Sequence, residues 1–252
     1  STMKLKSVLC ALAIAATVPL FADQTSSNIC GWMKVTSNLR NTIIGVPWVA
    51  VNGENDAAVK VAKLVKTDNL TQGDKLYLYD AANNTWFAWT LGETGWAADT
   101  TVTIDKAVVG TPAEDQALPR GQALILERQN VTAPFYLFGQ YTTSAVAPQT
   151  VQAGTAEAPV MMLLANPMPA AFDLNSGKIT NAGEADTIVV PQNDGAQTIY
   201  SLKNGKWGYY KKVTIEKFGL TMTQNQWCEA EPLPMGTGFW YVSRGGAATI
   251  AW

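Results

Sequence analysis

One phrase that occurs twice constrains the architecture of this chain more than any other feature of its sequence. The first copy covers residues 118–128 and the second covers residues 233–244. In each copy a Pro-x-Gly turn leads into a mostly apolar run that ends at an arginine, Arg128 or Arg244. Such a turn followed by an apolar run is typical of a β-strand. We therefore expect two strands at equivalent places in two related units.

Four further blocks recur in the same order, which extends the repeat over most of the chain. The pairs are 43–47 with 163–167, 69–74 with 181–186, Tyr79…Trp86 with Tyr200…Trp207, and 102–106 with 213–217. We expect an internal duplication in which residues 23–140 form a first β unit and residues 160–252 form a second. Residues 141–159 are rich in Thr, Ala, Gln and Pro, a composition that predicts a linker.

The fold class predicted is all-β, with two tandem homologous units, each a β-barrel or a β-sandwich with at most one short helix. Residues 75–80 and 85–91 flank turn residues and predict a hairpin. Further strands are expected at 102–104, 122–128 and 134–140. Residues 56–67 predict a short helix, because their apolar side chains recur at helical spacing.

The first 22 residues have the pattern of a secretory signal peptide. Lys4 and Lys6 precede a short apolar run at 8–18, and Ala22 is the expected last residue before cleavage. The run is too short to cross a bilayer as a helix. We expect a mature chain without a transmembrane span that is secreted, periplasmic or attached to the cell surface.

Two cysteines, Cys30 and Cys228, remain after the signal peptide is removed. Exported proteins fold in oxidising compartments, so an even number of cysteines there predicts disulfide pairing. We expect a Cys30–Cys228 disulfide, and the alternative is two free thiols.

The composition excludes several classes of function. The chain has no histidine, which removes histidine-dependent nucleophilic and acid–base catalysis and every histidine-containing metal site. The formal net charge is −2, and no basic run suggests nucleic-acid binding. Charged residues make up 15% of the chain, against roughly 25% in typical soluble domains. We favour an ordinary β-protein whose outer faces are rich in Thr, Asn and Gln as the reason for this deficit, and the alternative is a surface that is covered in an assembly. No metal or cofactor is expected.

Aromatic residues supply the candidate ligand-binding site. The candidates are Trp86, Trp89, Trp207, Tyr209 and Tyr210. Aromatic rings stack on sugar faces, so these residues could form a carbohydrate platform. Packing in the core and in cross-strand pairs is the more frequent use of such residues, and we favour it.

Two acidic pairs are the candidates for hydrolytic chemistry. Glu229 with Glu231, and Glu114 with Asp115, could cleave glycosidic bonds only at a suitable separation across a cleft. The arginines that close the repeated phrase, Arg128 and Arg244, are expected to hold a loop carboxylate or carbonyl rather than a substrate.

One combination of phrases resembles a known pattern. Residues 163–169 include Asn-Pro-Met-Pro, and residues 236–240 read Gly-Thr-Gly-Phe-Trp. An Asn-Pro-x-Pro phrase followed by Gly-x-Gly-Phe-Trp resembles the repeat of uncharacterised exported bacterial β-repeat proteins. The resemblance covers 160–252 better than 41–140, where residues 45–48 and 121–124 depart from it. It implies export and a β-fold, and it implies no catalytic residues.

The sequence therefore predicts a non-enzymatic structural or adhesive protein, exported to the cell surface or to an extracellular assembly. Its expected partners are other copies of itself or other surface proteins, and nucleic acid is not among them. The alternative is a carbohydrate-binding module protein whose exposed aromatics hold a glycan. A secreted glycoside hydrolase is the third hypothesis.

Overall fold

The computed structural model describes residues 30–35, 40–45, 47–49, 60–64, 69–131, 134–140, 142, 144–192, 194–217 and 220–252. Within these residues the chain is all-β, with one four-residue helix, α2 (Val61–Leu64). The predicted signal peptide and most of the helix predicted at 56–67 lie outside the described residues. In the part described, no helix is long and apolar enough to cross a membrane.

The first half of the chain builds a six-stranded sheet in which five strands follow the order β2-β7-β3-β4-β5. The strands are β2 (Asn41–Gly45), β7 (Ala123–Glu127), β3 (Lys75–Asp80), β4 (Thr85–Gly92) and β5 (Gly95–Ala98). These five pair antiparallel, and a short parallel strand, β6 (Val108–Val109), is added beside β4. The predicted hairpin is confirmed as β3 and β4, and its turn ends at Asn84 in the left-handed region (φ 52°).

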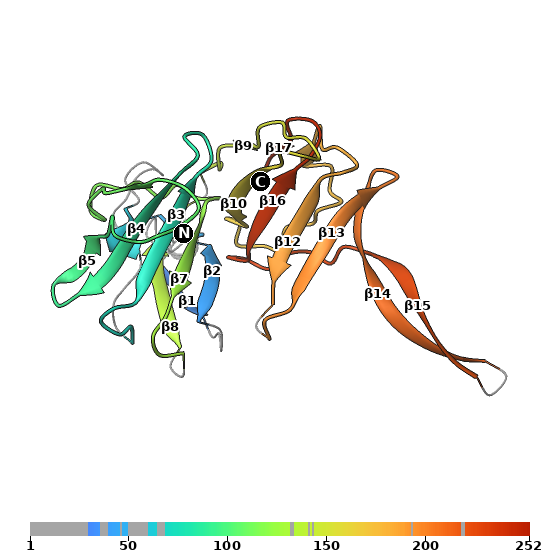
Figure 1. The fold of residues 1–252 in the computed structure, drawn as a ribbon, viewed down its shortest axis with the longest axis horizontal. Helices are drawn as coiled ribbons and strands as arrows, with labels where there is room; N and C mark the ends of the chain where they lie inside the picture. The colour runs from blue at the N-terminus through green and yellow to red at the C-terminus, as the bar shows by residue number, and fades with distance from the viewer. Residues whose placement is uncertain are drawn as a thin grey trace, which may run out of the picture.

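The second half builds a six-stranded antiparallel sheet in the order β10-β16-β12-β13-β14-β15. The strands are β10 (Val160–Ala165), β16 (Gly238–Ser243), β12 (Thr187–Pro191), β13 (Gln197–Lys203), β14 (Lys206–Lys217) and β15 (Leu220–Glu229). Figure 1 shows the two large sheets side by side, with β14 and β15 extending from the body as an arm.

Each large sheet is covered by a small one. In the first half β1 (Cys30–Val35) pairs with β8 (Phe135–Gln140). In the second half the order is β11 (Ile179–Thr180), β17 (Thr249–Ile250), β9 (Gln149–Thr150). Side chains from both layers form one buried cluster in each half, such as Phe135 with Leu124 and Ile250 with Phe239. The architecture is therefore of the β-sandwich type and not a barrel.

The residues predicted as a linker are partly built into the second sandwich. β9 lies within 141–159, and the next residue, Val151, is 1% exposed. The amide of Val151 donates a hydrogen bond to the carbonyl of Ala248 at 2.8 Å. The second sandwich therefore begins before residue 160.

Five strands of each large sheet correspond in order, while β6 and β15 have no counterpart in the other sheet. Equivalent cross-strand pairs are Leu76–Trp89 with Ile188–Tyr200, and Leu91–Trp96 with Leu202–Trp207. The Tyr200…Trp207 pair therefore takes the place of Trp89…Trp96, which has the same spacing, and the match with Tyr79…Trp86 is wrong. Similar topology is what a duplication requires, and common descent of the two halves stays a prediction.

One predicted block has the same sequence character but a different structure in each half. Residues 213–217 belong to β14, whereas residues 102–106 form a loop rather than the predicted strand. The reason is the availability of a partner. Residues 220–224 pair with residues 213–217, while in the first half Asp99 ends the strand by accepting hydrogen bonds from the amide and hydroxyl of Thr101 at 3.0 and 2.6 Å.

A fully buried aspartate precedes the equivalent strands β3 and β12. Asp74 accepts hydrogen bonds from the amides of Thr71 (2.8 Å) and Gln129 (2.6 Å). Asp186 accepts them from the amides of Gly183 (2.9 Å) and Arg244 (2.7 Å). Each carboxylate thus joins the turn before its strand to the end of β7 or β16.

This geometry corrects the expected equivalence of the two arginines. Arg244 takes the place of Gln129, so Arg128 and Arg244 differ by one position in the repeat. Arg128 is buried over the ring of Phe135 and donates to the carbonyl of Asn69 at 3.5 Å. Arg244 donates to the hydroxyl of Thr187 at 2.9 Å. Arg128 therefore holds a loop carbonyl, as expected, whereas the acceptor of Arg244 is a hydroxyl of β12 rather than a loop carboxylate or carbonyl.

The sandwiches meet through equivalent strands. The amide of Gly45 in β2 donates to the carbonyl of Gly236 at 3.1 Å, and the amide of Ala165 in β10 donates to the carbonyl of Gly121 at 2.9 Å. In each bond a strand residue of one sandwich donates to the turn glycine of the other, so the two bonds are related as in a twofold-symmetric dimer. The buried cluster at this junction contains Tyr79, Trp86, Ala123, Leu163 and Ala165, with Trp240 packed against it.

Candidate functional site

Four of the five aromatic residues predicted to bind a ligand are turned inward. Trp86, Trp89 and Trp207 are 8%, 0% and 3% exposed. Tyr209 is half-buried, and its ring meets that of Tyr200 edge to face at 5.6 Å. The packing that we favoured is confirmed for these four residues, because their rings lie in the cores and at the junction between sandwiches. The alternative, a carbohydrate platform, is wrong for them. Only Tyr210, which is 57% exposed, is accessible.

Tyr210 belongs to an exposed aromatic cluster at the root of the arm. Its ring lies 5.1 Å from that of Trp227 at an interplanar angle of 70°. The ammonium group of Lys203 lies 5.7 Å and 5.6 Å from the two ring centroids and donates to the Tyr210 hydroxyl at 3.2 Å. The perpendicular rings offer no flat platform for a sugar. The geometry is that of a cation–π cluster.

Sequence reasoning missed Trp227 as a member of this cluster. Trp227 lies opposite Tyr210 in the β14–β15 ladder, and directly opposed residues share a face of an antiparallel sheet. Its indole lies against Gly208, where an added Cβ would come within 2.6 Å of the ring. The Gly-Tyr-Tyr run after Trp207 was the available signal, since a glycine inside a strand marks a close approach.

The arm is the most distinctive feature of the surface. β13 pairs with β14 only as far as Gly208, whereas β14 and β15 continue to Lys217 and Leu220 without a break in register. Beyond Gly208 the two strands therefore lie outside the body of the second sandwich (Figure 1). Most of their side chains are exposed, among them Met222 at 52%.

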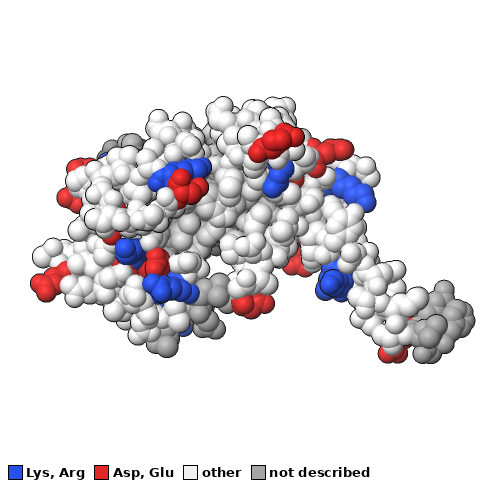
Figure 2. All heavy atoms as spheres, in the orientation of Figure 1, with Lys and Arg blue, Asp and Glu red and all other residues white. Residues whose placement is uncertain are grey.

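Charge is sparse on the face that Figure 2 shows, where small groups of basic and acidic side chains are separated by wide uncharged areas. The large exposed apolar residues lie on both halves; they are Val109, Phe138, Met161, Ile199, Tyr210 and Met222. Of these, Ile199 shares the outer face of the second sheet with Tyr210, by the register of β13 and β14.

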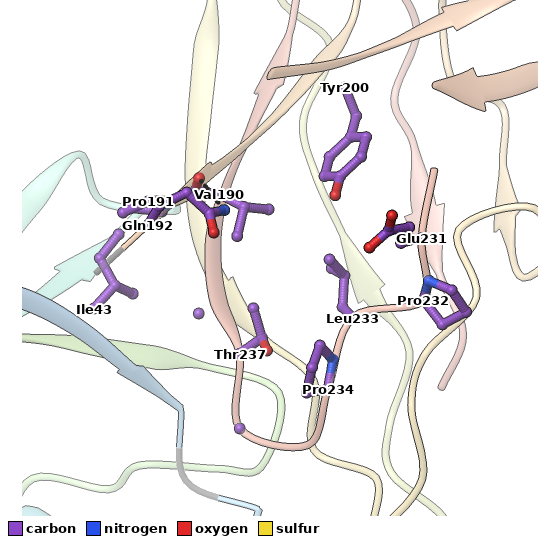
Figure 3. A pocket seen from close by; sticks show the side chains of 12 residues that line it. Ile43, Val190, Pro191, Gln192, Tyr200, Glu231, Pro232, Leu233, Pro234 and Thr237 are labelled. Carbon is purple, nitrogen blue, oxygen red and sulfur yellow. Dashed lines mark hydrogen bonds between the residues drawn. The ribbon is translucent and has the colours of Figure 1, made fainter. Parts of the chain in front are cut away.

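A cavity of about 430 Å³ lies near the junction of the sandwiches. Figure 3 shows the side chain of Tyr200 directed toward Glu231, which is the one carboxylate among the residues that line this cavity. Burial, and then the charge of Glu231, raise the pKa of the Tyr200 hydroxyl. Glu229 is not among the lining residues, and Glu114 and Asp115 lie exposed in another turn. Neither predicted acidic pair therefore faces this cavity, and the two-carboxylate arrangement of glycosidases is not present in it.

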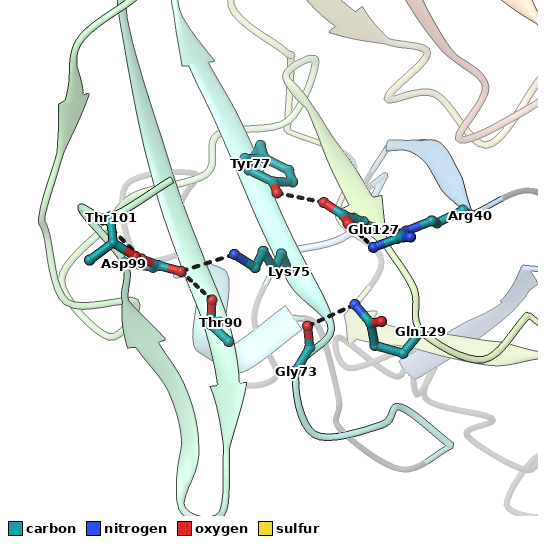
Figure 4. A network of polar contacts seen from close by, with 9 residues as sticks. All are labelled: Arg40, Gly73, Lys75, Tyr77, Thr90, Asp99, Thr101, Glu127 and Gln129. Carbon is teal, nitrogen blue, oxygen red and sulfur yellow. Dashed lines mark hydrogen bonds and ion pairs between the residues drawn. The ribbon is translucent and has the colours of Figure 1, made fainter. Parts of the chain in front are cut away.

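The outer face of the first sheet carries a polar network instead (Figure 4). Glu127 accepts hydrogen bonds from the hydroxyl of Tyr77 at 2.6 Å and from Arg40 at 2.7 Å. These bonds, the one from Tyr77 first, hold the pKa of Glu127 below its usual range. A carboxyl whose charged form is favoured in this way is a poor general acid at neutral pH.

Asp99 completes the network on the other side of β3. It accepts hydrogen bonds from the hydroxyls of Thr101 and Thr90, both at 2.6 Å. It also forms an ion pair with Lys75 at 3.3 Å. The bonds from the threonines, followed by that from Lys75, hold the pKa of Asp99 well below its usual range. The network is therefore structural: it joins β3, β4 and β7 across the sheet.

We expect the network to make the fold sensitive to acid. The pKa values of Asp99 and Glu127 are lower in the folded than in the unfolded chain, so their stabilisation is complete above about pH 4.5 and disappears as the pH falls through the folded values. Replacing Asp99 with Asn and Glu127 with Gln should lower the free energy of unfolding at pH 7 by about 2 kcal/mol. Urea unfolding at pH 7 and pH 3 measures this. If the double variant loses as much stability as the wild type between pH 7 and pH 3, the two carboxylates are not the source of the acid sensitivity.

The predicted disulfide is not formed. Cys228 carries a free thiol that lies 3.9 Å from the carbonyl of Gln226. The two cysteines belong to different sandwiches: Cys30 pairs with Gln140 in the first, and Cys228 pairs with Tyr209 at the root of the arm. No group of three or more acidic or cysteine residues in the described ranges could hold a metal ion.

No protein-family model, curated protein or solved structure matches this chain.

Proposed function

We propose that this chain is an exported, non-enzymatic structural or adhesive protein that acts at the cell surface or in an extracellular assembly. The observation that carries the proposal is the β14–β15 arm, which leaves the body and exposes long strand edges. An isolated two-stranded ribbon is marginally stable in water. An arm of this kind gains stability when it docks on another surface.

The two sites that could have favoured catalysis support the same proposal. The cavity near the junction is lined by a single carboxylate, and the carboxylates of the polar network have lowered pKa values. Enzymes that use a carboxyl as an acid need the opposite shift.

The proposal is tested on protein from an exporting host. We expect protease treatment of intact cells to degrade the protein, and light scattering and negative-stain electron microscopy of purified protein to show assemblies. We also expect no turnover on a panel of glycoside substrates. Hydrolysis of any glycoside, or resistance to protease on intact cells together with a lack of assemblies, would contradict the proposal.

Carbohydrate binding remains as a second candidate because Tyr210, Trp227 and Lys203 are accessible together. On a glycan array we expect no specific binding by the wild type. Glycan binding that is lost in Tyr210→Ala and retained in Ile199→Ala, a change on the same face, would favour the carbohydrate-binding hypothesis over ours.

A further inference from the structure

The arm has two free edges with different protection against further strand pairing. The edge of β14 beyond Gly208 carries Lys211, Lys212 and Glu216, and charged residues on an edge hinder the addition of another strand. β15 lies at the end of the described sheet order. From Leu220 to Cys228 it has no charged residue, no proline and no glycine.

The β15 edge is also regular. The ladder with β14 runs from Gly208–Glu229 to Lys217–Leu220 with every position paired in sequence, so no bulge distorts it. In an antiparallel ladder alternate residues of an edge strand direct their amide and carbonyl groups outward. β15 therefore presents an even row of donors and acceptors, and most of its side chains are exposed. A long, uncharged and regular edge is a template for another strand.

We propose that β15 pairs antiparallel with β15 of a second copy of this chain, which joins two arms into one four-stranded sheet. This inference rests on the proposed function and names the partner. A twofold axis normal to the sheet would pass through Gln224 or Asn225, the centre of the strand. With the axis at Asn225, Asn225 faces its own copy and Gln224 faces Gln226, whereas with the axis at Gln224 that residue faces its own copy and Asn225 faces Thr223. In neither register does a charged residue of one β15 face a charged residue of the other.

A second copy fits this edge better than an unrelated strand. β15 carries no charge between Leu220 and Cys228 that would select a complementary partner, whereas its central Gln-Asn-Gln run is complementary to itself. Stacked Gln and Asn side chains stabilise paired strands by hydrogen bonding. The same axis keeps corresponding faces together, so the apolar residues Val213, Ile215 and Met222 of both arms would lie on one face of the joined sheet.

Sedimentation as a function of concentration tests the inference. We expect the wild type to dimerise reversibly and Gln224→Lys with Asn225→Lys to weaken the dimer about tenfold or more, because lysines face lysines in either register. The matched control, Thr214→Lys with Gln197→Lys, adds the same charge away from the β15 edge and should dimerise like the wild type. A monomeric wild type, or a dimer that tolerates the β15 lysines, would overturn the inference.

Cross-linking keeps the test decisive if the lysine variant does not fold. In a background in which Cys10, Cys30 and Cys228 are serine, Gln224→Cys or Asn225→Cys should form an intermolecular disulfide on mild oxidation, and the one that does identifies the axis. Thr214→Cys, on β14, should form no intermolecular disulfide. Failure of both β15 variants to cross-link would overturn the inference. Assemblies that persist without β15 cross-links would leave the proposed function standing and exclude only this contact.

Discussion

Replacing Asp186 with alanine is expected to destabilise the second sandwich by about 3–5 kcal/mol, because three hydrogen-bond donors lose their acceptor and each buried donor left unsatisfied costs about 1–3 kcal/mol. Asp186 is fully buried and accepts three hydrogen bonds: from the amides of Gly183 and Arg244, and from the hydroxyl of Tyr241 at 2.8 Å. Without the carboxylate all three donors lose their partner. Because domains of this size are stable by about 5–15 kcal/mol, this change removes a large part of the total.

Denaturant unfolding followed by tryptophan fluorescence measures this effect. Two control variants distinguish the loss of this hydrogen-bond network from the general effect of removing an aspartate. Asp194→Ala removes an exposed aspartate that accepts a hydrogen bond from the amide of Ala196, and it should change stability by less than about 1 kcal/mol. Asp74→Ala should cost less than Asp186→Ala, because the carboxylate of Asp74 accepts hydrogen bonds from two amides, whereas that of Asp186 accepts one from a tyrosine as well. An Asp186→Ala variant as stable as Asp194→Ala would show that the network does not stabilise the fold.

The second large effect is expected at the junction of the sandwiches. A Cβ on Gly45 would lie 2.2 Å from the Cβ of Ala165 and 2.8 Å from the carbonyl oxygen of Gly236. Gly45→Ala should therefore force β2 and β10 apart and cost about 2–4 kcal/mol, at the upper end for overpacking. We expect a lower unfolding temperature and a separation of the single transition into two, one for each sandwich, measured by calorimetry.

The near symmetry of the junction supplies the control for this change. In Gly45→Ala with Ala165→Gly the methyl group moves to the equivalent strand, which removes the closest contact and should recover part of the lost stability. Gly92→Ala places a methyl group at an ordinary contact distance, 3.6 Å, from the carbonyl oxygen of Gly95, and should leave the junction unchanged. If the swapped variant is no more stable than Gly45→Ala, the Gly45–Ala165 contact does not explain the effect.

The positions of many strands along the chain could be predicted from local patterns. The Pro-x-Gly phrases do lead into β7 and β16, and turn residues between aromatic runs do form the β3–β4 hairpin. These patterns act over a few residues, where turn chemistry restricts the backbone directly. The match of Tyr79 with Tyr200 failed because the spacing of seven occurs twice in the first half. Only the registers of β3–β4 and β4–β5 distinguish the two pairs.

The aromatic site could not be predicted, because β4 does not alternate simply between polar and apolar residues. Its Trp86 and Trp89 lie on opposite faces of the strand, yet both are buried. One face meets the core of the first sandwich and the other meets the second sandwich at the junction. Burial of the second face depends on a neighbour far along the chain, so no period within the strand reveals it.

The sequence by itself determined where strands and tight turns can form, that the chain is all-β, and that two halves carry similar phrases. The tertiary structure decided which similar segments became similar structures. Residues 102–106 and 213–217 have nearly the same side chains, but only the second set has a strand opposite it, in β15. A strand is stable when its hydrogen-bonding groups are paired. Local propensity can favour an extended segment, but it cannot supply the partner, and the partner is what made the arm.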